Sequence, residues 1–167
     1  MSAAAAENHL CGVRLVAFDV DGVFTDGRFY LSDDGSESKA FCTQDGFGVR
    51  QLLAAGIEVV VISGRRSEAV ERRMNELGVM RVVQGCNDKI AAFSTITAEL
   101  GIADAECVYV GDDVPDLPLL TKVGYAVAVA NAVNSVREQC DYTTLARGGF
   151  GAVREVCDLV LAARDES

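Results

Sequence analysis

The chain has 167 residues, half of which are hydrophobic, and it carries a formal net charge of −10 at pH 7. This length suits one domain with a sizeable core, and the negative charge argues against nucleic acid and anionic membranes as partners, because both require basic patches. No apolar run approaches the length of a membrane span. We expect one domain over residues 13–167 behind a disordered tail over residues 1–12, which lacks the basic and apolar regions of a signal peptide.

The cysteines and the histidine narrow the chemistry that is available. None of the six cysteines shows Cys-x-x-Cys spacing, and most lie in apolar contexts, which predicts reduced thiols and a cytoplasmic location. The only histidine, His9, lies in the tail, so Ser-His-Asp triads and histidine-based zinc sites are excluded. An enzyme of this composition would use carboxylates, a lysine and a hard cation.

Short β-rich segments alternate with helical patterns along the chain. The predicted strands are Arg14–Val20, Ile57–Ser63, Arg81–Gln84, Cys107–Gly111 and Tyr125–Val129. The predicted helices are Gly48–Ala55, Ser67–Leu77, Asp88–Leu100, Pro115–Lys122 and Ala152–Ala163. Alternation of this kind predicts an α/β fold, with a single Rossmann-like, mostly parallel sheet flanked by helices.

The segment Arg28–Cys42 breaks this alternation. Two β-rich stretches, Arg28–Ser32 and Ser36–Cys42, flank Asp33-Asp34-Gly35, which predicts a β-hairpin with an Asp-Gly turn. Because the hairpin follows the first strand directly, we expect it to overhang the carboxyl edge of the sheet. A decorative hairpin is the simpler interpretation, and a flap or an oligomer contact is the functional one.

Two aspartates, Asp19 and Asp21, end the first predicted strand. Buried, unpaired charge is strongly disfavoured, so paired carboxylates at such a position usually coordinate a metal or transfer protons. The backbone turns away at a strand end, which lets both side chains converge on the carboxyl edge, where open α/β folds bind ligands. Taken alone, the pattern is equally compatible with a solvated acidic turn.

Three further motifs lie at the carboxyl ends of successive predicted strands. Ser63-Gly64-Arg65 offers a hydroxyl and backbone N–H groups for phosphate oxygens, although Ser63 could equally cap a helix. Lys89 lies at a helix start and by itself is compatible with a surface lysine. Gly111–Asp116 is a dense acidic loop, for which a capped helix start with solvated carboxylates is the alternative.

In combination these motifs are far more specific. Asp-x-Asp, Ser, Lys and Gly-Asp-Asp-x-x-Asp occur in this order, and in this the chain resembles the haloacid dehalogenase superfamily over essentially its whole length. A response-regulator receiver domain also combines acidic residues with a lysine, but it lacks Asp-x-Asp-Gly on the first strand. The resemblance implies a phosphatase that works through an aspartyl phosphate.

The resemblance also implies a role for each motif. Asp19 would be the nucleophile, and Asp21 would protonate the leaving group and then activate water. Ser63 and Lys89 would bind the oxygens of the transferring phosphoryl group, over which negative charge spreads in the transition state.

A divalent cation must offset the repulsion between a phosphate dianion and the nucleophile. Mg²⁺ suits oxygen ligands from Asp19, Asp112 and the backbone carbonyl of Asp21. Asp113 and Asp116 would orient the metal-bound waters from outside the coordination shell.

The spacing of the motifs leaves no room for a cap domain. Asp19–Ser63 holds only the hairpin and one helix, and Ser63–Lys89 holds one helix and one strand. A capless member needs a large substrate or a neighbouring subunit as a lid. Within this branch the chain resembles the 3-deoxy-D-manno-octulosonate 8-phosphate phosphatases, on stretches that include Asp19–Gly27, Asp45–Arg50 and Gly148–Leu161.

That family releases phosphate from an eight-carbon sugar acid in the cytosol, on the route to lipopolysaccharide, as a homotetramer in which a neighbour's hairpin covers the active site. The resemblance therefore implies a small phosphorylated sugar acid as substrate and makes the hairpin a lid. The implied substrate-binding residues are Asp21, Cys42, Thr43, Gln44, Asp45, Gly46, Arg50, Gly64, Arg65, Arg73 and Lys89. Arginines suit the substrate carboxylate, because a guanidinium binds it bidentately; a surface ion pair is the alternative for Arg73.

The chain departs from the family pattern where the sugar end should be recognised. Cys42 and Gln44 stand where Asn and Arg are frequent, and Phe150 takes the arginine position of Gly-Gly-Arg-Gly. Phosphatases of nine-carbon, sialic-acid-type 9-phosphates are therefore an alternative. A different class is a non-catalytic oligomerisation module, since some relatives have lost the nucleophile, but this chain keeps Asp19 and Asp21.

Overall fold

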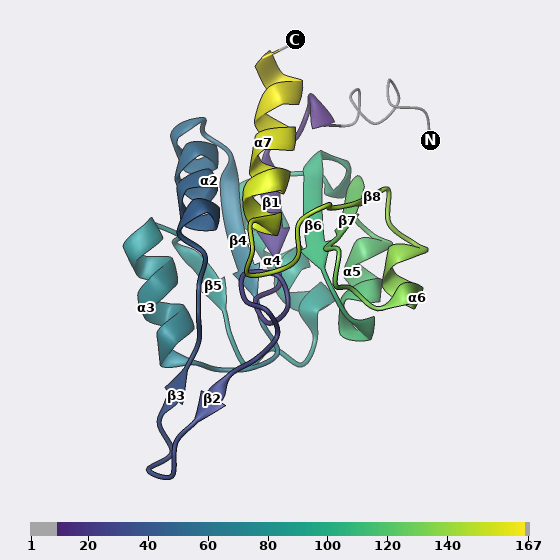
Figure 1. Ribbon diagram of the computed structural model, residues 1–167. Coiled ribbons are helices and arrows are strands. Elements are labelled where there is room, and N and C mark those ends of the chain that lie inside the picture. Colours follow the sequence, from purple (N-terminus) through teal and green to yellow (C-terminus); the bar gives the residue numbers. More distant parts are fainter. Residues whose placement is uncertain (1–9, 166–167) are drawn as a thin grey trace.

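The computed structural model describes residues 10–165, and its centre is a six-stranded parallel sheet (Figure 1). The strand order is β5-β4-β1-β6-β7-β8. The bounds are β1 Leu15–Phe18, β4 Glu58–Ile62, β5 Arg81–Val83, β6 Cys107–Gly111, β7 Tyr125–Ala128 and β8 Tyr142–Thr143. Residues 1–9 of the predicted tail lie outside the described residues, whereas Leu10 is buried in the core.

The register of the central strands determines which residues lie side by side at the carboxyl edge of the sheet. Every residue of β1 is buried, as expected for a parallel strand covered on both faces. Phe18, the last residue of β1, is paired with Val61 of β4 and Val110 of β6. The residues that follow these three strands therefore emerge side by side at the carboxyl edge.

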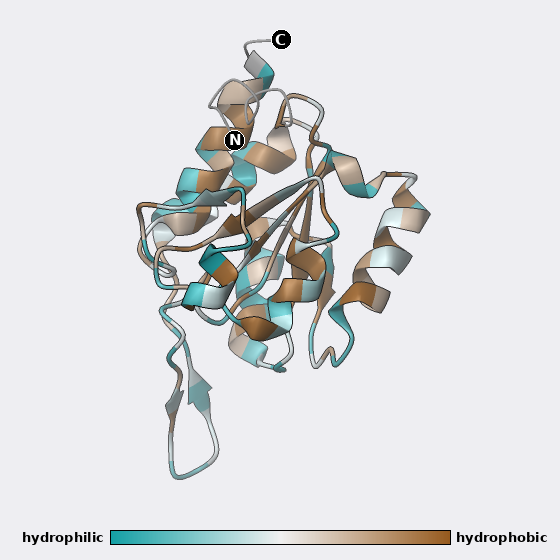
Figure 2. Ribbon diagram, turned by 90° about the vertical axis from the view of Figure 1, so that its right-hand side faces the viewer, coloured by the Kyte–Doolittle hydropathy of each residue, from teal (hydrophilic) through white to brown (hydrophobic). Residues whose placement is uncertain are grey.

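Helices cover both faces of the sheet. Their bounds are α2 Thr43–Ala54, α3 Glu68–Leu77, α4 Lys89–Leu100, α5 Leu117–Leu120, α6 Asn134–Arg137 and α7 Ala152–Asp165, with 3₁₀ turns η1 Asp104–Glu106 and η2 Val114–Asp116. α2 packs against α7 on one face, and α4 packs against α5 on the other (Figure 1). Figure 2 shows the hydrophobic strands between these layers. Among residues 10–165, no helix has the length and apolarity that crossing a membrane requires.

The predicted alternation of strands and helices is confirmed, and the largest error in a boundary is at α2. This helix begins at Thr43, five residues before the predicted start at Gly48. Glycines disfavour helices, but here they allow close packing. A Cβ at Gly46 would lie 2.3 Å from the Arg73 guanidinium, and one at Gly48 would lie 3.0 Å from Cβ of Cys157. Tertiary packing therefore overrides the local preference.

Three short elements were not predicted, and one predicted helix is divided. The hydrophobic pattern did not indicate η1, α6 or the edge strand β8, which at three, four and two residues are too short to show a period. The segment predicted as the helix Pro115–Lys122 forms η2 followed by α5.

The hairpin forms as predicted and projects away from the body of the domain (Figure 1). Its strands, β2 Tyr30–Leu31 and β3 Glu37–Ser38, are antiparallel and shorter than expected. Gly35 adopts a φ of +83° in the turn, a conformation that favours glycine. Tyr30 and Leu31 are 64% and 68% exposed, so the hairpin presents apolar side chains to the outside.

Candidate active site

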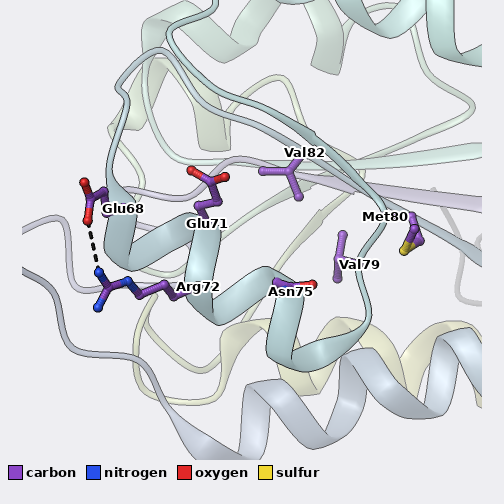
Figure 3. A pocket seen from close by; sticks show the side chains of 7 residues that line it. All are labelled: Glu68, Glu71, Arg72, Asn75, Val79, Met80 and Val82. Atoms are coloured by element: carbon purple, nitrogen blue, oxygen red, sulfur yellow. Dashed lines mark hydrogen bonds and ion pairs between the residues drawn. The ribbon is translucent and has the colours of Figure 1, made fainter.

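A crevice of about 330 Å³ opens at the carboxyl ends of β1, β4 and β6. It is lined by Asp19, Asp21, Gly27, Ser63, Gly64, Arg65, Lys89, Asp112, Asp113, Pro115 and Asp116. Every residue to which the sequence assigned phosphoryl or metal chemistry is in this lining. A larger hollow of about 630 Å³ lies between α3 and β5, but Figure 3 shows that its side chains do not converge on one point.

Asp19 lies at the floor of the crevice, directly after β1. Its backbone N–H donates to the Val110 carbonyl (3.0 Å), which extends the strand pairing, and the residue is only 7% exposed. The Lys89 ammonium donates to its Oδ1 at 2.7 Å. Burial, followed by the nearby Asp116 carboxylate, raises the pKa of Asp19 to about 6, although Lys89 opposes the rise.

Lys89 joins two carboxylates. It is the first residue of α4, whose start is capped by Asp88 through the backbone N–H of Ala91 (3.0 Å). Its ammonium donates to Oδ1 of Asp19 and Oδ1 of Asp116, at 2.7 Å each. Burial alone would lower the pKa of Lys89, but the two carboxylates outweigh it and raise that pKa. Lys89 is therefore a cation fixed beside Asp19.

Both oxygens of Asp116 are already used by the protein. Oδ1 accepts from Lys89 and from the Tyr109 hydroxyl (2.7 Å each), and Oδ2 accepts from the backbone N–H groups of Asp112 and Asp113 (3.0 and 3.3 Å). Asp116 therefore holds the acidic loop in shape rather than presenting a free oxygen to the crevice.

The donor set of the crevice suits a hard divalent cation. Asp19, Asp112 and Asp116 each place a carboxylate oxygen within 4.8 Å of the others, and Lys89 is the only ammonium that the structure records between them. Burial, then repulsion from Asp19 and Asp116, raises the pKa of Asp112 to about 8. Crowded carboxylates that resist ionisation are the environment that Mg²⁺ neutralises.

Gly22 lets the loop after Asp21 approach this cluster. Its φ is +90°, and a Cβ there would lie 2.0 Å from Oδ2 of Asp112. The Asn131 amide donates to the Gly22 carbonyl (2.9 Å) and its oxygen accepts from the N–H of Gly148 (2.6 Å). The glycine-rich turn before α7 thereby supports the loop that carries Asp21.

Ser63 and Arg65 form the wall of the crevice after β4. Ser63 is 3% exposed, and its Oγ accepts from the backbone N–H of Arg65 (3.3 Å). It does not cap α3, because the N-cap of that helix is Ser67. The alternative interpretation of Ser63 as a helix cap is therefore wrong.

Asp21 faces the base of the hairpin. Its carboxylate pairs with the ammonium of Lys39, which directly follows β3, and lies 3.6 Å from Nε of Arg65. Glu37 of β3 accepts from the same Arg65 guanidinium (2.7 Å), and the Phe29 ring lies 3.9 Å from it. The hairpin therefore overhangs the carboxyl edge, as its position in the sequence predicted.

The remaining predicted substrate residues lie outside the crevice lining. They are Cys42, Thr43, Gln44, Asp45, Gly46, Arg50 and Arg73. Asp45 is 1% exposed and accepts from the N–H of Arg154 in the first turn of α7 (2.8 Å). Arg50 donates to the Glu76 carbonyl (3.0 Å), and Arg73 donates to the Glu76 carboxylate (2.8 Å).

Sequence reasoning gave no role to three residues that shape the site, namely Lys39, Tyr109 and Asn131. Tyr109 carried a signal, because a hydroxyl within the otherwise aliphatic strand Val108–Val110 needs a buried partner. Lys39 and Asn131 carried none, since their partners depend on how the hairpin and the glycine-rich turn fold back.

The sequence of the chain is similar to those of phosphatases of the haloacid dehalogenase superfamily, in agreement with the geometry of the crevice. The sequence profile of haloacid dehalogenase-like hydrolases matches residues 79–153. The 3-deoxy-D-manno-octulosonate 8-phosphate phosphatase KdsC of Escherichia coli K12 is 47% identical over 161 residues, which cover 96% of this chain and 84% of that protein. The KdsC protein of Salmonella typhi is 47% identical over 152 residues, covering 91% of this chain and 81% of that protein.

Solved structures of phosphatases from the same family superpose closely on this chain. The 3-deoxy-D-manno-octulosonate 8-phosphate phosphatase of Moraxella catarrhalis, in complex with magnesium, phosphate and KDO, superposes with a TM-score of 0.96 at 40% identity, covering 99% of this chain and 95% of that one. The cobalt-bound enzyme of Haemophilus influenzae gives a TM-score of 0.91 at 36% identity, covering 95% and 93%.

Proposed function

Because the chain belongs to the 3-deoxy-D-manno-octulosonate 8-phosphate phosphatase family of haloacid dehalogenase-like hydrolases, we propose that it hydrolyses 3-deoxy-D-manno-octulosonate 8-phosphate to the free sugar acid and phosphate. The observation that carries this proposal is the convergence of Asp19, Lys89 and Asp112 in one crevice of a chain so similar to these phosphatases. The eight-carbon substrate predicted from the sequence agrees with the comparisons.

Mg²⁺ is the cofactor. Asp19, Asp112 and the backbone carbonyl of Asp21 would hold it, because both oxygens of Asp116 are occupied by protein donors. When bound, the ion supplies positive charge that reduces repulsion between the phosphate dianion and the nucleophile. Asp113 and Asp116 would act from outside the coordination shell, Asp116 by fixing the backbone of the acidic loop.

The first half of the reaction transfers the phosphoryl group to the enzyme. An oxygen of the Asp19 carboxylate attacks phosphorus, an oxygen–phosphorus bond to Asp19 forms, and the bond from phosphorus to the sugar oxygen breaks. The departing oxygen takes a proton from the Asp21 carboxyl group, so the free sugar acid leaves. Ser63 and Lys89 bind the phosphoryl oxygens during the transfer.

The second half regenerates the nucleophile. A water molecule gives a proton to the Asp21 carboxylate while its oxygen attacks phosphorus, and the bond between Asp19 and phosphorus breaks. Phosphate leaves, and both aspartates return to their starting states. The separation of roles follows from position, because Asp19 lies at the crevice floor and Asp21 faces the hairpin.

The sugar end of the substrate would meet the start of α2 and Arg65. The turn over residues 148–151 supports this assignment, because Gly148 packs on the Gly22 carbonyl while Gly151 lies beside the Gln44 amide. Phe150, in the same turn, is 66% exposed and is available to contact ligand or protein. Gln44, at the start of α2, therefore lies beside the turn that supports the loop after Asp21.

The assembly would be a homotetramer in which a neighbour's hairpin closes the crevice. The exposed Tyr30 and Leu31 side chains support this proposal, since clustered exposed apolar residues mark interaction surfaces. The enzyme would work in the cytoplasm, on the route to lipopolysaccharide. Free thiols at Cys42, Cys86, Cys107, Cys140 and Cys157 suit a reducing compartment.

The test is phosphate release in the presence of Mg²⁺ from 3-deoxy-D-manno-octulosonate 8-phosphate, a nine-carbon 9-phosphate and simple sugar phosphates. We expect a strong preference for the eight-carbon acid that Asp19→Asn abolishes and Asp104→Asn, a matched change outside the crevice, retains. Preference for the nine-carbon acid would instead assign the chain to the phosphatases of sialic-acid-type 9-phosphates. Inactivity on every substrate would favour the oligomerisation module.

A further inference from the structure

Four charged side chains form a closed ring between the crevice and the hairpin. Asp21 and Arg65 come from the crevice, and Glu37 and Lys39 come from the hairpin. Lys39 contacts Asp21 directly and lies 3.7 Å from Glu37, while Arg65 lies 2.7 Å from Glu37 and 3.6 Å from Asp21. Each cation therefore touches both anions, and the charges alternate around the ring.

The ring is sheltered from water on the side of the hairpin. The Lys39 side chain is fully buried, and the side chains of Asp21 and Glu37 are 23% and 18% exposed. The Phe29 ring covers the two cations, 3.9 Å from the Arg65 guanidinium and 5.6 Å from the Lys39 ammonium. The Arg65 side chain is 47% exposed, whereas Lys39 and the two carboxylates are paired at a depth where separating them would leave one charge uncompensated.

We propose that Lys39 and Glu37 are positioning residues for catalysis, Lys39 by fixing the carboxylate of Asp21 and Glu37 by fixing the guanidinium of Arg65. This inference rests on the proposed function, in which Asp21 moves protons and Arg65 meets the substrate. It gives the hairpin a task in its own active site, separate from the task of covering a neighbour's crevice.

The two hairpin residues should have separable kinetic effects. Lys39→Met removes the only ammonium recorded against Asp21 and leaves Arg65 paired with Glu37, so kcat should fall about 10- to 100-fold, part of what acid–base catalysis contributes. Glu37→Gln removes the charge that holds Arg65 and leaves Lys39 on Asp21, so KM should rise several-fold with a smaller change in kcat. Lys39→Arg, which keeps the charge, should restore most of the loss.

A change of leaving group shows whether Lys39 acts through Asp21. p-Nitrophenolate departs without protonation, so Lys39→Met should release it from p-nitrophenyl phosphate in a burst equal to the enzyme concentration, followed by slow turnover. The burst reports an aspartyl phosphate that waits for the misplaced base. Lys122→Met is the matched control, because Lys122 pairs with Asp104 at 2.5 Å away from the crevice, and it should show neither effect.

The outcomes separate this inference from the proposed function and from a folding defect. A wild-type enzyme that hydrolyses p-nitrophenyl phosphate but not the eight-carbon acid would contradict the function while leaving the burst test in force. Equal losses on both substrates without a burst, or no loss at all, would overturn the role of Lys39. If Lys39→Met does not fold, the double variant Lys39→Met with Glu37→Gln replaces it, because this variant leaves Asp21 paired with Arg65. For the inference to stand, the double variant must give the burst.

Discussion

The raised pKa of Asp112 makes the stability of the metal-free enzyme depend on pH. Its folded-state pKa of about 8 lies above the ordinary value of 3.8, because burial and then Asp19 and Asp116 disfavour its charged form. The folded protein thus binds a proton that the unfolded chain has lost between these two values. This contribution to stability is complete below pH 3.8 and disappears as the pH rises toward 8.

The size of this change in unfolding free energy follows from the width of the pH interval over which Asp112 titrates. Asp19 titrates at about 6, so the interval from pH 6 to pH 8 belongs mainly to Asp112. Two pH units correspond to at most about 2–3 kcal/mol of unfolding free energy. For a chain of this size, the melting temperature of the metal-free protein should fall by about 4–12 °C across the interval.

Differential scanning calorimetry in EDTA and in saturating Mg²⁺ at pH 6, 7 and 8 tests this reasoning. Mg²⁺ neutralises the ionised carboxylates, so the rise in melting temperature that it causes should grow from pH 6 to pH 8. Asp112→Asn should abolish the fall in melting temperature and the growth of the Mg²⁺ effect in this interval. Asp104→Asn, an equal charge change outside the crevice, should retain both. A metal-free melting temperature that is constant or rises with pH would refute the electrostatic account of the cluster.

Three substitutions test other contacts of the site. Gly22→Ala should lower kcat by about 100-fold, because its Cβ would displace Asp112, whereas Gly12→Ala, with open space around it, should not. Tyr109→Phe should cost about 1 kcal/mol of unfolding free energy by denaturant titration and reduce kcat, because Asp116 loses a donor. Asp45→Ala should lower the unfolding free energy by about 1–2 kcal/mol, because the contact with the start of α7 is lost. An unchanged stability with a raised KM would instead assign Asp45 to substrate binding.

Most of the sheet was predictable because its strands are buried on both faces. Runs such as Glu58–Ile62 and Cys107–Gly111 are apolar, short and followed by helical patterns, and their boundaries were predicted to within two residues. The start of α2 was not predictable, because the glycines that locally oppose a helix are required by Arg73 and Cys157 on neighbouring helices. That requirement exists only after α3 and α7 have packed.

The phosphoryl half of the site was predictable for a related reason. Asp19, Ser63, Lys89 and Asp112 follow the strands or begin the helices that the sheet brings to one edge, so chain order alone predicted that they would meet. The sugar half was not predictable in the same way, because the predicted residues at the start of α2 lie outside the crevice lining. Gln44 lies beside the glycine-rich turn, which the periodicity of the sequence does not position.

The residues proposed for phosphoryl transfer and for proton transfer are supported by different parts of the fold. Asp19 and its partner Lys89 are anchored to the sheet through β1 and the start of α4, which strand pairing and helix capping hold in place. Asp21 is anchored instead to Lys39, 18 residues further along the chain and on a hairpin that projects from the body (Figure 1). A displacement of the hairpin would therefore disturb proton transfer before it disturbed phosphate binding. Lys39→Met should for that reason slow turnover while leaving the affinity for inorganic phosphate close to that of the unmodified enzyme.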